Sequence, residues 1–176
     1  DLVSNGPATE YHLTVTIPAL VDASPTPATL AYRNPTYHFE VAYPWDFIID
    51  GTCPTEGTIA SPVVSFRLWE ASYYQGTNLL DACVVIDVDR SEDALSTCTG
   101  TRGPNEDYWG QETIHGILFS ITSRGGVAAG HNHDVTSYRT VRAGGCYEIS
   151  LLVHASSPGV YAPGTVSEFD KDAVMA

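Results

Sequence analysis

The sequence predicts a domain of the α+β class, and three observations support this prediction. Several segments alternate apolar and polar residues with the two-residue period of a half-buried strand. Charged residues make up only 16% of the chain, against about 25% in an average protein, while tyrosine is abundant. Two short stretches, which start at Ser91 and Ser167, carry the N-cap signals of short helices.

The expected strands cover most of the chain. Residues 11–17 alternate apolar and polar side chains, and within 37–44 the side chains of Phe39, Val41 and Tyr43 share one face. The strand expected over 79–89 has apolar residues on both faces, which places it inside the sheet. The further strands are expected over 62–69, 79–89 (the central one), 112–121 with a His115-Gly116 hairpin turn inside it, 134–142 and 146–154.

Loops and an N-terminal arm are expected between and before these strands. Residues 99–111 read as a polar loop, and residues 123–134 read as a glycine-rich loop. Residues 1–28 contain one strand and a proline-rich connector, so they are interpreted as an arm appended to a main domain of residues 29–176. The strand in this arm is a candidate for pairing with a neighbouring subunit.

Charge and cysteine content restrict the compartment and the partners. The chain has 8 basic and 21 acidic residues, a net charge of −13, which disfavours nucleic acids and anionic membranes as partners. No stretch approaches the roughly 18 apolar residues of a transmembrane helix. Four cysteines and a single lysine favour an oxidising compartment. A secreted, periplasmic or cell-surface location is therefore expected.

Several segments resemble one domain family. The run "YRNPTYHFEVAYPWDF" is similar to the strand and the tyrosine-proline entry of PsbP-like domains, as found in bacterial secreted proteins and lipoproteins. The segments "GTNLLDACVVIDV", "AAGHNHDVTSYRTVRAGGCYEISLLVH" and "EFDKDAV" resemble later blocks of that group. The resemblance covers about residues 32–176. It implies an antiparallel β-sheet with flanking helices, an extracytoplasmic location and no catalytic residues.

The four cysteines are interpreted as two structural disulfides. Four cysteines allow three pairings, and no C-x-x-C spacing points to zinc or thiol redox chemistry. The PsbP-like resemblance implies a bond between Cys98 and Cys146, which leaves Cys53 with Cys83. A bond between Cys83 and Cys98 is a local alternative. The chain departs from the family pattern in its arm, in Cys53 and Cys83, and in the histidine pair that follows.

A histidine pair gives the first candidate ligand site. In extended backbone His131 and His133 project to the same side, a spacing that can chelate zinc, copper or nickel, with Asp134 or His154 completing the shell. The alternative is that both are solvated loop histidines. We expect no other cofactor.

A calcium site is the second metal hypothesis. The segment "DVDRSED" repeats oxygen donors at alternate positions, but it lacks the glycine and the glutamate of an EF-hand. An irregular calcium site or a simple strand end with a helix cap remain as interpretations.

Aromatic and acidic residues in loops suggest a third kind of site. If the aromatic side chains are exposed, they form a platform that binds a protein or a glycan. The aromatic residues are Tyr73, Tyr74, Tyr108 and Trp109. The adjacent Glu106 and Asp107 would suit a hydrolytic cleft, although adjacent loop carboxylates more often face water. Trp45 and Trp69 are assigned to the core.

These observations lead to a functional hypothesis without a reactive centre. No nucleophile elbow, zinc-protease, P-loop or kinase motif occurs. The expected function is that of a non-enzymatic extracytoplasmic accessory, surface or assembly protein that acts through protein contacts or self-association. A metal-binding extracellular protein is the alternative, and a glycan-binding or hydrolytic domain is the second alternative.

Overall fold

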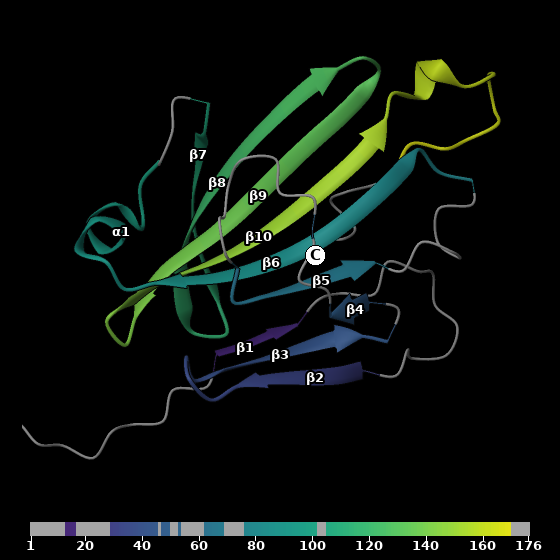
Figure 1. Cartoon of the computed structure of the whole chain (residues 1–176). Coiled ribbons are helices and arrows are strands. Elements are labelled where there is room, and N and C mark those ends of the chain that lie inside the picture. Colours follow the sequence, from purple (N-terminus) through teal and green to yellow (C-terminus); the bar gives the residue numbers. More distant parts are fainter. Residues whose placement is uncertain are drawn as a thin grey trace, which may run out of the picture.

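A computed structural model of the chain describes residues 13–16, 29–45, 47–49, 53, 62–68, 76–101 and 105–169, and most of its regular structure is β-strand (Figure 1). Three strands form a small sheet in the order β1-β3-β2, and seven form a large antiparallel sheet in the order β4-β5-β6-β10-β9-β8-β7. The strands are β1 (Leu13–Thr16), β2 (Thr29–Asn34), β3 (Phe39–Pro44), β4 (Phe47–Ile49), β5 (Val64–Leu68), β6 (Leu79–Asp89), β7 (Asp107–Ile114), β8 (Ile117–Ala128), β9 (His131–Arg142) and β10 (Gly145–Ser156).

The α+β prediction with flanking helices is wrong. The described residues contain one short α-helix, α1 (Glu92–Thr97), and one 3-10 turn, Pro158–Val160. No helix forms at Ser167, which instead makes a bridge to Thr77. The physical reason is that the small sheet takes the place expected for helices, because it supplies the apolar surface that covers one face of the large sheet.

The core lies between the two sheets. Phe39, Val41 and Tyr43 of β3 are buried, as their alternation predicted, and they pack against the face of the large sheet that carries Phe66 and Ile86. The ring of Phe66 is 4.8 Å from that of Tyr43 and is fully buried. We call this side of the large sheet the core face. The expected position of Trp45 in the core is wrong, because it is 55% exposed just after β3 ends.

Three two-residue turns build the β7-β8-β9-β10 meander. They are His115-Gly116, Ala129-Gly130 and Ala143-Gly144, and all six residues have positive φ. This conformation gives a twist that matches paired strands, and glycine adopts it without strain. The His115-Gly116 turn was predicted. The glycine-rich loop expected over 123–134 is wrong, because β8 and β9 run through it and leave only the second turn.

Three other expectations concern the positions and bounds of strands. Strand β6 lies between β5 and β10, inside the sheet as its apolar residues predicted. The loop expected over 99–111 is too long, because β7 begins at Asp107. The strand expected over 11–17 is present as β1, which pairs in parallel with β3 of its own chain. Residues 1–12 and 17–28 of the arm lie outside the described residues.

A test of this core uses matched aromatic and aliphatic truncations. We expect Phe66→Ala to lower the free energy of unfolding by about 3–5 kcal/mol, because it removes a fully buried ring and leaves a cavity between the sheets. Leu118→Ala, at a side chain that is 53% exposed, should change it by no more than about 0.5 kcal/mol. Chemical denaturation measures both. Equal effects of the two substitutions would contradict the two-sheet core.

Candidate functional site

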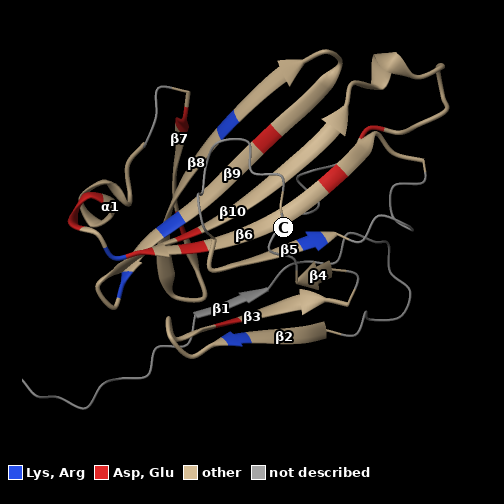
Figure 2. Ribbon diagram, in the orientation of Figure 1, with Lys and Arg blue, Asp and Glu red and all other residues tan. Residues whose placement is uncertain are grey.

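The face of the large sheet opposite the core carries polar residues at its centre. Successive side chains of a strand point to opposite faces, so the register places Ser137 and Arg139 of β9 beside Ser150 and Glu148 of β10. All four residues are buried. We call this side the polar face. Figure 2 shows that β5, β6, β8 and β9 carry charged residues along mostly uncharged ribbons.

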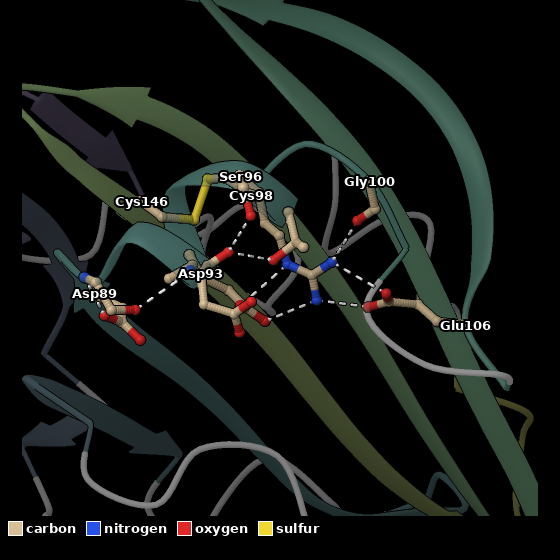
Figure 3. The surroundings of a disulfide bond; sticks show 12 residues. Asp89, Asp93, Ser96, Cys98, Gly100, Glu106 and Cys146 are labelled. Atoms are coloured by element: carbon tan, nitrogen blue, oxygen red, sulfur yellow. Dashed lines mark hydrogen bonds and ion pairs between the residues drawn. A yellow bond between two sulfur atoms is a disulfide. The ribbon is translucent and has the colours of Figure 1, made fainter.

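A buried ionic cluster occupies one end of the polar face, in which Nε of Arg139 lies 3.0 Å from Oε2 of Glu148 without forming a hydrogen bond. The Arg139 guanidinium donates to both oxygens of Glu106, at 3.1 and 2.5 Å, and to Oε1 of Glu148 at 3.2 Å. It also donates to the carbonyl oxygen of Gly100 at 3.2 Å. The side chains of Arg139, Glu106 and Glu148 are only 4–8% exposed. Figure 3 shows Gly100 and Glu106 in this cluster beside a disulfide.

Hydroxyl groups complete the cluster. Thr122 donates to Glu106 at 2.9 Å, and Ser150 donates to Glu148 at 3.1 Å. Burial alone lowers the pKa of the Arg139 guanidinium, but its hydrogen bonds to the two carboxylates and their charges raise that pKa above the usual value. Arg139 is therefore a permanent cation held by two carboxylates.

Helix α1 and the residues after it lie over this end of the polar face. The structure pairs Cys98, which directly follows α1, with Cys146 at the start of β10, and this is the pairing that the family resemblance implied. Ser91 caps the helix by accepting from the backbone N–H of Ala94, and Asp89 accepts from the N–H of Ser91. The proposed calcium loop is thus a strand end and a helix cap.

The second disulfide lies at the other end of the polar face. The structure pairs Cys53 with Cys83 of β6, and both cysteines are buried. Cys83 and Leu152 are register partners on this face. The local alternative of Cys83 with Cys98 does not occur.

Three histidines gather near the β8-β9 turn. His131 and His133 lie on β9 and not in a loop, and His133 is the register partner of His154 on β10. The rings of His133 and His154 stack at 4.1 Å, and Nδ1 of His131 lies 3.0 Å from Nε2 of His154. Asp134 points to the core-face side, where its register partner is Gly125. The structure therefore brings His154, and not Asp134, to the histidine pair.

This histidine cluster does not complete a metal shell. Among the described residues, no group of three or more His, Cys, Asp and Glu side chains is arranged to hold a metal ion. The shortest contact, between His131 and His154, is that of a hydrogen bond between two imidazoles.

A cavity of about 580 Å³ lies on the polar face beside these histidines. Across the sheet, Arg124 of β8, Val135 of β9 and Leu152 of β10 form one row of its lining, and the two aliphatic side chains make an apolar floor. His133, His154 and Asp81 of β6 form the next row, and Asn105 also lines the cavity.

The predicted aromatic platform is described only in part. Tyr108 and Trp109 are 51% and 60% exposed on β7, at a bulge in the outermost strand of the large sheet. Tyr73, Tyr74 and Trp69 lie outside the described residues. The two carboxylates considered for hydrolysis have different surroundings. Glu106 is bound by Arg139, whereas Asp107 is exposed.

Sequence reasoning did not identify Arg124 and Arg139. Arg139 could have been found from strand alternation, since it has the same parity as His131 and His133 in one strand, whereas Arg124 lies in the stretch predicted as a glycine-rich loop. An arginine at such a position within a strand of serine and threonine signals a buried partner of opposite charge.

The function of this chain is inferred from its fold and the contacts described above. Scans of the chain against protein-family models and curated proteins find no match. The PsbP-like resemblance therefore stays a prediction. Within the described residues, no helix has the length and apolar character needed to cross a bilayer.

The ionic cluster can be tested by removing its cation. We expect Arg139→Met to lower the free energy of unfolding by about 3–5 kcal/mol, because two buried carboxylates lose their counter-ion. Adding Glu106→Gln and Glu148→Gln to this variant should recover most of the loss. The control is Arg33→Met, in an exposed ion pair with Glu40, which should cost no more than about 1 kcal/mol. Equal losses for Arg139→Met and Arg33→Met in urea unfolding would contradict the cluster.

Proposed function

We propose that this chain is a non-enzymatic extracytoplasmic binding domain that contacts an extended segment of a partner protein through the outer edge of β7. The observation that carries the proposal is the position of β7, which pairs with β8 on one side and has no described strand on the other. An edge strand of this kind can accept a further strand by main-chain hydrogen bonding.

The backbone groups available on β7 follow from its hairpin. Ile114 and Ile117 flank the two-residue turn, so they form a hydrogen-bonded pair, and the pairs alternate from there. The N–H and C=O groups of Gln111 and Thr113 consequently point away from β8. These groups form the part of the ladder that an added strand would use.

Exposed aromatic side chains support the same edge as a contact surface. Tyr108 and Trp109 precede Gly110, whose φ of 134° belongs to the bulge that interrupts β7. Large aromatic side chains contribute strongly to protein interfaces when a partner buries them. The bulge also ends regular pairing, and it thereby limits an added strand to the segment beyond Gly110.

Two further features support a binding role outside the cytoplasm. Cys53 with Cys83 and Cys98 with Cys146 are at disulfide distance, as expected of a protein from an oxidising compartment. The two buried carboxylates of the polar face, Glu106 and Glu148, both accept hydrogen bonds from Arg139 and share its positive charge. They are therefore suited to a structural role and not to acid-base chemistry.

A displayed library of random peptides tests this proposal with backbone variants. Peptides selected on the wild-type protein should bind Thr113→Ala equally well, because this variant keeps the outward N–H. They should bind Thr113→Pro at least about tenfold more weakly, because proline removes that N–H while the bonds to β8 remain. Trp109→Ser should also weaken binding. Biolayer interferometry measures the affinities.

Two outcomes of the peptide selection would contradict the proposal. A library that yields no peptide with β7-dependent affinity, or peptides that bind Thr113→Pro as tightly as wild type, would contradict the proposal. Circular dichroism of each variant must match that of wild type, since the comparison requires an intact β7-β8 hairpin.

A further inference from the structure

We propose that the cavity on the polar face binds a small organic molecule with one carboxylate and a flat apolar body. The site is separate from the β7 edge, and the proposal does not depend on the function proposed above. Three observations carry it: an arginine with no partner among the described residues, a neighbouring carboxylate that is already paired, and an apolar floor beside stacked rings.

Arg124 is the one arginine in the described part of the chain for which the structure shows no hydrogen bond, ion pair or ring contact. The others all have partners: Arg33 with Glu40, Arg67 with Asp81, Arg90 over the ring of Tyr37, Arg139 with Glu106 and Glu148, and Arg142 with a further contact. Arg124 is half-buried and lines the cavity. A guanidinium in this position can bind a carboxylate through two parallel hydrogen bonds.

Two acidic residues line the cavity, Asp81 and Asp134, and the structure shows neither of them paired with Arg124. The side chain of Asp134 points to the core-face side and has an interaction of its own. Asp81 accepts from Nε and Nη2 of Arg67 at 3.3 and 3.1 Å, and its side chain is only 14% exposed. This pair is electrically neutral as a unit, so the cavity retains the positive charge of Arg124. The net charge of −13 on the chain opposes a second negative charge on the ligand. A monoanion is therefore favoured over a phosphate or a dicarboxylate.

The floor and one wall of the cavity suit a flat apolar body. Arg124, Val135, Leu152 and Cys83 are successive register partners across β8, β9, β10 and β6. A carboxylate on Arg124 thus places the rest of the ligand over Val135 and Leu152. The stacked rings of His133 and His154 stand beside this floor. The volume of about 580 Å³ is typical of small-molecule sites.

The same cavity is less suited to a metal ion. Its unpaired charge is the cation Arg124, and the described side chains offer no group of three or more metal donors. The organic anion is for this reason the ligand we propose, and metal binding becomes an outcome of the test.

The test uses cinnamate as the probe and its amide, cinnamamide, as the uncharged isostere. Titration calorimetry of the intact chain should show saturable binding of one cinnamate, with cinnamamide at least about tenfold weaker, because the amide lacks the charge that pairs with Arg124. Arg124→Gln should weaken cinnamate at least about tenfold. Arg33→Gln changes the net charge equally on the small sheet and should leave the affinity unchanged.

A second variant blocks the cavity without touching its charge. Gly126 lies opposite His133 on the cavity side, its φ is not positive, and a Cβ there would meet no atom within 4 Å. Gly126→Leu should therefore fold normally and abolish cinnamate binding while retaining Arg124. Its thermal unfolding checks the fold.

Three results would overturn the proposal. They are the absence of saturable cinnamate binding to wild type, equal cinnamate affinity in wild type and in both cavity variants, and equal affinities of wild type for cinnamate and cinnamamide. Binding of zinc ion that His154→Ala removes, in a protein that does not bind cinnamate, would overturn it in favour of a metal site.

Discussion

The polar face of the large sheet depends on the ion cluster around Arg139. A sheet with one apolar face normally exposes its other face to water, yet here residues at the centre of that other face are buried. Burying a guanidinium is unfavourable unless carboxylates neutralise it and accept its hydrogen bonds. Glu148 lies beside Arg139 on β10, while Glu106 comes from the segment before β7. The cluster therefore attaches a loop to the sheet as well as satisfying a charge.

The Cys98–Cys146 disulfide and the ion cluster act on the same part of the chain. The disulfide attaches the end of α1 to β10, and the carbonyl of Gly100 accepts from Arg139. Residues on both sides of β7 are thus fixed, through Gly100 and Glu106 before it and through the β7-β8 turn after it. This arrangement closes one end of the polar face. At the other end, by contrast, the histidines and Arg124 border an open cavity. One sheet surface consequently has a structural half and a half able to bind a ligand.

Much of the strand content was predictable, because alternation records which side chains are buried. It placed Phe39, Val41 and Tyr43 in the core and β6 inside the sheet. Alternation does not reveal what covers an apolar face, so it predicts the strands over 11–17 and 37–44 without showing that they form a second sheet there; the flanking helices are what the PsbP-like resemblance implies. Because glycine is common in loops, the glycine-rich stretch before His131 predicts a loop, although the Ala129-Gly130 turn needs only two residues. The histidine pair was noticed, but its contact with His154 depends on the β9-β10 register, which the residue pattern alone did not specify.

The account depends most directly on the buried state of the Arg139 guanidinium, and proton-nitrogen NMR of arginine side chains measures that state. Nη1 and Nη2 of Arg139 donate to Glu106 and Glu148, so their N–H resonances will exchange slowly with solvent and rotation about the guanidinium bonds will be slow. The Nη–H resonances of Arg33, whose side chain is 79% exposed and pairs with Glu40 through Nε, provide the reference for fast exchange. Arg139 Nη–H groups that exchange as fast as those of Arg33 would contradict the cluster and the division of the polar face that follows from it.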